Sequence, residues 1–140
     1  MVDKISEVMT RDPITLASTD TLAHAAKQMR DADVGDVIVV EGNAVRGLVT
    51  DRDIVVRGVA EDLDPFSTAL ASVCTHDLVT VSPDDSIDTA VRLVREYAVR
   101  RLPVVTADGT PVGVVSIGDL AVERDTDSAL AEISAAEPNN

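Results

Sequence analysis

The sequence feature that most constrains the fold is an internal duplication. Shifting the chain by 65 positions, and by 66 after a turn, aligns Val8–Ile54 with Val73–Leu120, and 13 of the 47 positions are identical. The offset changes from 65 to 66 at the turn where Gly42-Asn43 of the first copy aligns with Asp108-Gly109 of the second. Such residue pairs are typical of hairpin turns. We therefore expect two similar units in this chain of 140 residues.

The two copies predict the same order of elements: strand, helix, strand, strand, helix. The first copy has an extended piece at Ile14–Leu16, a helix from Leu22, strands at Val37–Val40 and Val45–Thr50, and a helix from Asp51. The second has Val79–Val81, a helix from Ile87, strands at Leu102–Val105 and Val112–Ser116, and a helix from Ile117. Each first helix carries an apolar face at helical spacing: Leu22, Ala25, Ala26 and Met29, then Ile87, Ala90, Val91 and Val94.

One such unit leaves a sheet face and helix stripes unburied, so we expect the two to pack together. The predicted fold class is α/β (α+β), with two tandem units related by internal pseudo-two-fold symmetry. The expected boundaries are 1–61 for the first unit, 62–69 for a linker and 70–124 for the second. Residues 125–140 form an acidic tail in which we expect a short helix and then a mobile end.

Charge and composition exclude several classes of partner. The formal net charge is −13 and aromatic residues make up 1% of the chain, so neither a phosphate backbone nor an anionic membrane is an expected partner. The sequence shows no signal peptide and no apolar run long enough to cross a membrane. One cysteine cannot form an internal disulfide. We therefore expect a cytoplasmic protein.

No arrangement of reactive side chains predicts catalysis or metal binding. Cys74 aligns with Met9 and is expected in the core. His24 is expected on a helix surface and His76 in a turn. The acid pair Asp84-Asp85, like Asp51 and Asp53, fits the start of a helix better than acid–base chemistry. The chain is therefore expected not to be an enzyme and to hold no metal and no cofactor.

The stretch "GLVTDRDI", Gly47–Ile54, returns as "GVVSIGDL", Gly113–Leu120, and allows two interpretations. A hydroxyl residue three positions before an aspartate is a capping-box pattern for a helix start, and the glycine then lets a helix approach the strand closely. The same geometry can also bind a ligand. A helix start attracts anions, and the carboxylate can accept both hydroxyls of a ribose.

The duplicated order of elements, the run "RRLPVV" and the repeated ending resemble a pair of CBS domains, also called a Bateman module. The likeness runs from Val2 to about Arg124, and "TDRDIVVRGVAEDLDP" is similar to the small stand-alone CBS proteins of the hypoxic response protein type. The resemblance implies a non-catalytic regulatory protein that binds an adenine nucleotide (AMP, ADP, ATP or the S-adenosylmethionine type) in the cleft between its copies. It also implies a homodimer, for which Val55, Val59, Val91 and Val94 are candidate contacts.

By position, the resemblance assigns ribose and phosphate contacts to the two endings. These are Thr50, Asp53 and Arg52 in one copy, and Ser116, Asp119, Arg100 and Arg101 in the other; the adenine walls are Ile14, Ile38, Val79 and Pro103. The copies differ, because Gly35-Asp36 stands where the second copy has Arg100-Arg101. The arginines could instead be surface residues paired with acids. The alternative function is a dimeric structural or protein-interaction module with degenerate ligand sites.

Overall fold

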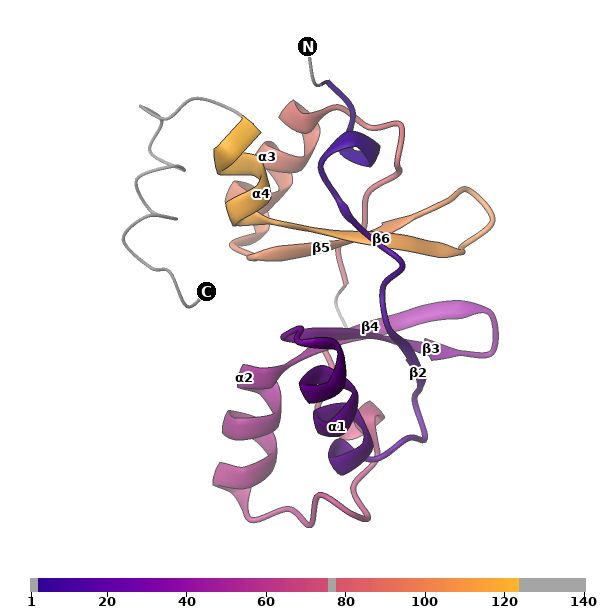
Figure 1. Ribbon diagram of the computed structural model, residues 1–140, viewed down its shortest axis with the longest axis vertical. Coiled ribbons are helices and arrows are strands. Elements are labelled where there is room, and N and C mark those ends of the chain that lie inside the picture. The colour runs from indigo at the N-terminus through magenta and orange to yellow at the C-terminus, as the bar shows by residue number, and fades with distance from the viewer. Residues whose placement is uncertain (1–2, 76–77, 124–140) are drawn as a thin grey trace. The chain divides into compact units, whose positions relative to one another are not determined.

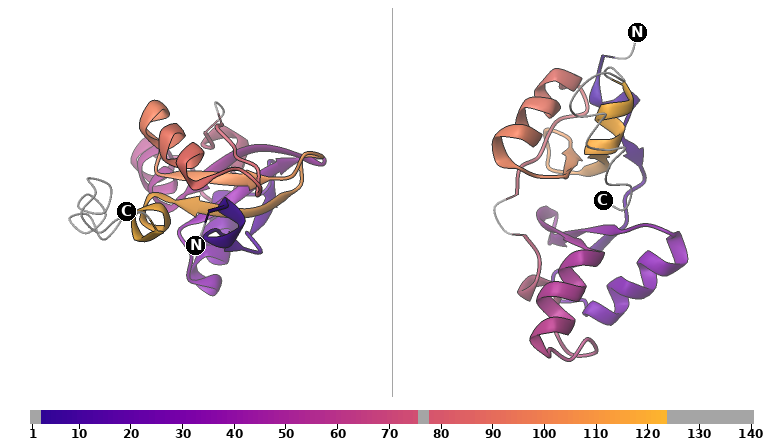
Figure 2. Two further views of the ribbon diagram at one scale, coloured as in Figure 1. Left: turned by 90° about the horizontal axis from the view of Figure 1, so that it is seen from above. Right: turned by 90° about the vertical axis from the view of Figure 1, so that its left-hand side faces the viewer.

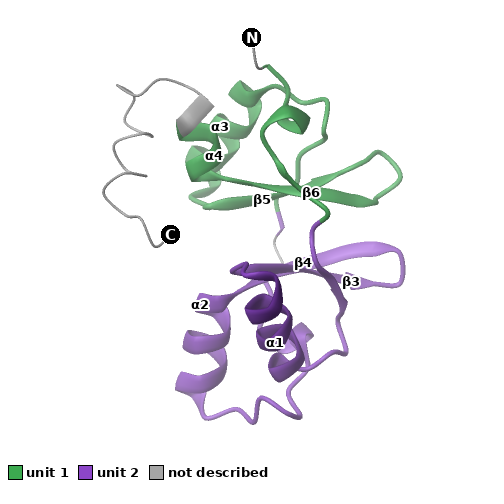
Figure 3. Ribbon diagram, in the orientation of Figure 1, with its two compact units in different colours: residues 1–12, 79–140 green, residues 13–78 purple. Residues whose placement is uncertain are grey.

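The computed structural model describes residues 3–75 and 78–123, and the chain divides into two compact units (Figure 3). Unit 1 contains residues 1–12 and 79–140, and unit 2 contains residues 13–78. Each has a three-stranded sheet and helices, so the expected mixed α/β fold with two tandem units is confirmed. The expected acidic tail from residue 125 lies outside the described residues.

Unit 2 is a sheet with its two longer helical segments on one of its faces (Figures 1 and 2). Its central strand pairs in parallel with the strand before it and antiparallel with the strand after it. The strands are β2 (Thr15–Ala17), β3 (Asp36–Glu41) and β4 (Ala44–Thr50). The helical segments are α1 (Leu22–Ala32), the continuous run α2 (Asp51–Asp53), η2 (Ile54–Gly58, a π-helical turn) and η3 (Val59–Glu61), and the short turn η4 (Leu70–Ser72).

Unit 1 repeats this layout, again with both of its longer helices on one face of the sheet (Figures 1 and 2). The strand order is β1-β6-β5, and both pairings are antiparallel. The elements are η1 (Ile5–Glu7), β1 (Thr10–Arg11), α3 (Ile87–Tyr97), β5 (Arg101–Val105), β6 (Pro111–Ser116) and α4 (Ile117–Glu123). The predicted hairpin turns are confirmed, since Gly42 and Gly109 adopt positive φ angles of 63° and 91° between the paired strands.

The opening segments of the two repeats are exchanged between the units. Thr10 in the first copy pairs with Val114 in β6, within unit 1. Its counterpart Thr75 in the second copy forms a bridge to Leu48 in β4, within unit 2. Each unit therefore completes its sheet with a segment that the sequence repeat assigns to the other copy, and the compact units follow different boundaries from the repeats.

The expected extended piece at Val79–Val81 forms only an isolated bridge, Val81 to Val104, where unit 2 has the strand β2. In unit 2 the amide of Ile38 donates to the Ile14 carbonyl at 2.8 Å. Pro103 occupies the equivalent position in unit 1 and has no N–H to donate. The parallel pairing therefore begins one step later in unit 1.

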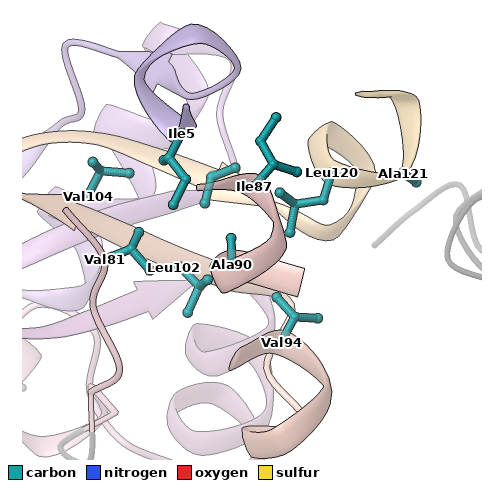
Figure 4. Packing of buried hydrophobic residues seen from close by; sticks show 10 residues of the cluster. Ile5, Val81, Ile87, Ala90, Val94, Leu102, Val104, Leu120 and Ala121 are labelled. Carbon is teal, nitrogen blue, oxygen red and sulfur yellow. The ribbon is translucent and has the colours of Figure 1, made fainter. Parts of the chain in front are cut away.

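Each unit has its own apolar core under its helices. Figure 4 shows the core of unit 1, in which Ile5 from η1 lies with Ile87 and Ala90 from α3 and Leu120 from α4. The core of unit 2 contains Leu22, Ala25, Met29, Val37, Val39, Val49, Leu70, Val73 and Cys74. Burying one such large side chain contributes about 1.5–3 kcal/mol. These clusters stabilise the sheet ends on which the candidate site is built.

One predicted helix-face residue and one predicted dimer contact need correction. Ala26 is exposed, because the face of α1 that packs on the sheet is narrower than the apolar pattern. Val94 is 4% exposed and lies in the core of unit 1, so it is not available for the dimer contact expected of it. Within residues 3–75 and 78–123, no helix has the length and apolar character needed to span a bilayer.

Candidate functional site

The repeated hydroxyl–aspartate ending forms a capping box in both units. In unit 2 the Thr50 amide donates to Asp53 Oδ2 at 2.9 Å, and the Asp53 amide donates to Thr50 Oγ1 at 3.1 Å. In unit 1 the Ser116 amide donates to Asp119 Oδ2 at 2.9 Å, and the Asp119 amide donates to Ser116 Oγ at 3.1 Å. The capping interpretation of the pattern is therefore confirmed, and it fixes each carboxylate at the junction of a strand and a helix.

The capping bonds leave hydrogen-bonding capacity at each ending. An ionised carboxylate offers about four lone pairs, and the capping box uses one of them on Oδ2. Both hydroxyls of a vicinal diol could donate to the remaining lone pairs. Thr50 and Ser116 accept a hydrogen bond in the box, so each hydroxyl proton can still be donated to an oxygen of a ligand. All four side chains are half-buried. Capping and diol binding are thus chemically compatible at the same residues.

Of the predicted adenine-wall residues, Ile38 and Pro103 lie on β3 and β5, and Ile14 and Val79 lie in the extended segments that run beside these strands. Ile14 and Ile38 are joined by a backbone hydrogen bond in unit 2, where Ile38 is fully buried and Ile14 is half-buried. In unit 1 Pro103 is buried in β5, and its carbonyl accepts from the Val81 amide at 3.0 Å. Val79 is half-buried and precedes that contact. In each pair, the residue on the opening segment (Ile14 or Val79) keeps part of its surface exposed, whereas its neighbour on the strand (Ile38 or Pro103) is buried by the chain itself.

The predicted arginines occupy different parts of the two endings. Arg101 lies directly across the β5–β6 pair from Ser116 and is half-buried. Arg100 is exposed, and its carbonyl accepts from the Ile117 amide at 2.8 Å, where β6 meets α4. Arg52 is exposed in the first turn after Thr50. The structure thus brings Arg100 and Arg101 to the Ser116 ending and Arg52 to the Thr50 ending.

Asp36 lies beside the Thr50 ending, although it is not among the site residues predicted from the sequence. It lies directly across the β3–β4 pair from Thr50, in the place that Arg101 has beside Ser116. The signal was present in the alignment of Asp36 with Arg101. The cross-strand register was needed to show that both face the hydroxyl of their own ending.

Gly47 and Gly113 make room for a neighbouring backbone segment, whereas the sequence pattern predicted that they make room for a helix. A Cβ at Gly113 would lie 2.6 Å from Met9 Sδ and 2.8 Å from the Thr10 carbonyl oxygen. A Cβ at Gly47 would collide with the Thr75 carbonyl and would lie 3.0 Å from Cys74 Sγ. The exchanged opening segments cross the sheets at these two points, so each glycine admits a crossing backbone rather than a helix.

Cys74 lies against this crossing and is 1% exposed, which confirms its expected place in the core. Burial raises the pKa of its thiol above the ordinary value, and the nearby Arg46 guanidinium opposes that shift in part. The neutral thiol is thereby favoured. Cys74 is therefore a packing residue of the folded protein.

The other reactive side chains have structural partners. His24 is exposed on α1, and its Nδ1 lies 3.4 Å from Asp20 Oδ1. Asp85 accepts from the Ser82 amide at 2.8 Å in the turn before α3, as Asp20 accepts from Ala17 at 2.9 Å before α1. Across the described parts of the chain, no three His, Cys, Asp or Glu side chains gather in a way that could hold a metal ion. His76 lies outside the described residues.

Comparisons with known proteins agree with the repeat and the fold. The CBS domain family matches twice, at residues 5–58 and 70–124. The CBS domain-containing protein YhcV of Bacillus subtilis is 34% identical over 137 residues, which cover 95% of this chain and 96% of YhcV. Hypoxic response protein 1 of Mycobacterium tuberculosis is 31% identical over 116 residues, covering 82% of this chain and 80% of that protein.

Solved structures share the architecture. Hypoxic Response Protein I, solved with two coordinated zinc ions, has a TM-score of 0.73 and 30% identity, and the match covers 85% of this chain and 97% of that chain. The CBS domain pair of protein MJ0100, solved in complex with 5-methylthioadenosine and S-adenosyl-L-methionine, has a TM-score of 0.76 and 21% identity, covering 87% and 95%. At 21% identity, the match to MJ0100 supports a shared fold only.

Proposed function

Because this chain belongs to the CBS-domain family, whose paired domains are generally regulatory, we propose that it is a non-catalytic regulator that binds an adenine nucleotide. The ligand class is AMP, ADP, ATP or a nucleoside of the S-adenosylmethionine type. The proposal includes a cytoplasmic location, in keeping with the reduced single cysteine and the acidic composition.

The observation that carries the proposal is the pair of matching endings. Both place a half-buried carboxylate and a hydroxyl at the junction of a strand and a helix, with hydrogen-bond lengths that agree between the units. Asp53 and Asp119 have lone pairs to accept a ribose diol, and a charge-assisted hydrogen bond of this kind is stronger than a neutral one. A helix cap alone explains the pattern, and the remaining lone pairs are as accessible to a ligand hydroxyl as to water.

Thermal unfolding with and without nucleotide tests the proposal. A ligand that binds only the folded chain at ten times its dissociation constant adds about 1.4 kcal/mol to the free energy of unfolding, so the melting temperature should rise. AMP, ADP, ATP and S-adenosylmethionine should each be tried at millimolar concentration, with calorimetry to measure affinity.

The matched control is the double variant Asp53→Asn, Asp119→Asn. An asparagine oxygen can still accept the capping bond from Thr50 or Ser116, so the variant should fold, but its amide nitrogen cannot accept from a ribose hydroxyl. We expect the nucleotide shift to disappear in it. Absence of binding by all four ligands to the unaltered chain, with dissociation constants above about 1 mM, would reject the proposal.

A second candidate function is a protein-interaction module, and one observation favours it. Unit 2 exposes apolar side chains on and after its second helical run: Val55 is 57% exposed, Val59 61% and Phe66 73%. Val55 and Val59 are four positions apart on this run, and exposed apolar side chains grouped in this way commonly mark a contact with another protein. We propose that a second copy of the chain covers this surface in a homodimer, which is compatible with either function.

A further inference from the structure

The second helical run of unit 2, residues 51–61, has one face toward α1 and another toward solvent (Figure 1). Ile54 packs on the core of unit 2, and at Gly58, four positions later, a Cβ would lie 2.8 Å from Leu22 Cδ1 in α1. Arg57 also turns toward its own unit, since its Nη1 donates to the Val73 carbonyl at 3.4 Å. The apolar residues of the exposed face are Val55, Val56 and Val59, which are 57%, 43% and 61% exposed.

This exposed face has opposite charges at its two ends. Arg52 lies in the first turn of the run, three positions before Val55, and Asp62 follows the run, three positions after Val59. Residues three or four positions apart lie on the same side of a helix, so the two charges continue the apolar face. Both charged side chains are exposed.

The aspartates beside Arg52 are engaged at the helix start. Asp51 Oδ1 accepts from the Arg52 amide at 2.8 Å, and Asp53 Oδ2 accepts from the Thr50 amide at 2.9 Å. Each of these acids therefore has a backbone partner in its own unit. Arg52 is the charged side chain that stands next to the valines at this end.

The other end of the run is fixed by a Schellman motif. The Asp62 amide donates to the Val59 carbonyl at 3.1 Å, and the Leu63 amide donates to the Gly58 carbonyl at 3.1 Å. Asp62 adopts the left-handed φ of 60° that this motif requires, which aspartate tolerates better than most residues. Asp62 is therefore held at a defined place just beyond Val59.

The order of residues along this face is self-complementary. Arg52 and Asp62 are each five positions from residue 57, and Val55 and Val59 are each two positions from it. If two copies of the run lie antiparallel about a two-fold axis at residue 57, Val55 faces the partner's Val59 and Arg52 faces the partner's Asp62. Packed helices lie about 8–10 Å apart, a gap that an arginine and an aspartate side chain can bridge. A parallel pair would instead bring the two arginines together.

We propose that unit 2 binds unit 2 of a second copy through this antiparallel contact, in which Arg52 of each chain pairs with the partner's Asp62 on either side of the valines. A two-fold interface needs a patch that is complementary to itself, and the order of this face meets that requirement. The inference rests on the proposed homodimer and adds to it the orientation of the contact and the residues that select it. Arg52, for which the resemblance implied a phosphate contact, is in this proposal a residue of the dimer contact.

Charge reversal tests the pairing, with the dimer dissociation constant measured by analytical ultracentrifugation. Arg52→Asp and Asp62→Lys each turn both ion pairs into like-charge contacts, so each should raise the dissociation constant at least ~10-fold. The two variants change the net charge of −13 in opposite directions, so general repulsion between the chains cannot explain weakening by both. Lys27→Asp, on the exposed face of α1, changes the charge as Arg52→Asp does and should alter the dissociation constant less than about twofold.

Mixing the two reversed variants provides a second comparison. In a dimer of one Arg52→Asp chain and one Asp62→Lys chain, both pairs again have opposite charges. The mixed dimer should therefore form with an affinity close to that of the unaltered chain, and its formation also shows that both variants fold. The double variant Arg52→Asp, Asp62→Lys should recover its homodimer for the same reason.

The outcomes separate the pairing from the homodimer itself. If the unaltered chain dimerises and Arg52→Asp dissociates no more readily than Lys27→Asp, the antiparallel pairing is wrong and the homodimer stands. The same conclusion follows if mixing Arg52→Asp with Asp62→Lys restores no dimer. If the unaltered chain is a monomer throughout the micromolar range, the proposed homodimer fails and the inference fails with it.

Discussion

Gly47 and Gly113 are the two residues whose identity is most tightly set by the structure. Each lies where the backbone of an exchanged segment crosses the sheet, at Thr75 and Thr10 respectively. Movement of neighbouring side chains alone would not make room for a Cβ at either position, because the obstructing atoms include a backbone carbonyl oxygen. The conservative change to alanine should therefore be costly at both positions.

We expect Gly47→Ala and Gly113→Ala each to lower the free energy of unfolding by about 1–3 kcal/mol, as overpacking does in cores. Gly113→Ala should be the milder, since its nearest neighbour is the flexible Met9 side chain. Urea unfolding measures both. The control Ala26→Ser, on the exposed face of α1, should stay within about 0.5 kcal/mol of the unaltered chain. Equal stability of Gly47→Ala and this control would show that the crossing is not rigid.

At the residue scale, the sequence predicted patterns more reliably than their tertiary reasons. The capping partners of Asp53 and Asp119 followed from local spacing alone. The neighbour of Gly47 did not, because Thr75 is far away in sequence and reaches it only through segment exchange. The alignment of Asp36 with Arg101 is visible in the sequence, but its place across from Thr50 depends on a cross-strand register.

The helices that follow β4 and β6 begin at capping boxes, and these boxes make the junction rigid. An N-cap hydroxyl satisfies an amide that the helix leaves without a partner. In both units the bond from the aspartate amide is 3.1 Å long. The element that positions the candidate site is therefore also the start of a helix, so stability and binding depend on the same side chains.

We expect Thr50→Ala and Ser116→Ala each to lower the free energy of unfolding by about 1 kcal/mol, the usual effect of losing an N-cap hydroxyl. Thr50→Ser and Ser116→Thr keep the hydroxyl and should remain close to the unaltered chain. Denaturant unfolding of all four variants provides the comparison. A loss in the two hydroxyl-retaining variants as large as in the alanine variants would mean that packing, rather than capping, sets the stability of the junction.

At the element scale, the order and approximate bounds of the strands and helices followed from the apolar periodicity. The hairpins also followed, because glycine-containing turns stand between the predicted strands. The segment Val79–Val81 was expected as a strand by analogy with Ile14–Leu16, and it forms only a bridge. The missing N–H donor at Pro103 accounts for this difference. Local sequence patterns did not predict it, because the pairing partner is distant in sequence.

At the scale of the whole molecule, unit 2 of a single chain leaves several large apolar side chains exposed to solvent. Val55 and Val59 lie on the second helical run, and Phe66 follows it. The exposure of these two valines agrees with the dimer contacts predicted for them from the sequence. The other two predicted contacts lie on α3, where Val94 is buried in the core of unit 1 and Val91 is half-buried against that core. A closed two-fold pair is the commonest way to cover such a surface.

Light scattering at micromolar concentration should therefore give twice the mass of one chain. We expect Val55→Asp with Val59→Asp to shift the protein to the monomer mass, because a carboxylate cannot be buried there without a partner. Ala26→Asp adds a charge to the exposed face of α1 and should leave the dimer intact. A monomer mass for the unaltered chain would count against the dimer, whatever the nucleotide experiments show.

The exchange of opening segments has a consequence for the origin of this chain. Within each unit, the segment that pairs near Gly47 or Gly113 comes from the other repeat. A single repeat expressed as its own polypeptide would therefore lack the neighbour that completes its sheet, unless a second identical polypeptide lent it one. An ancestral gene encoding one repeat would then have produced a domain-swapped homodimer, and tandem duplication would have joined its two subunits into one chain. The separately expressed halves 1–61 and 62–140 should accordingly reassemble on mixing.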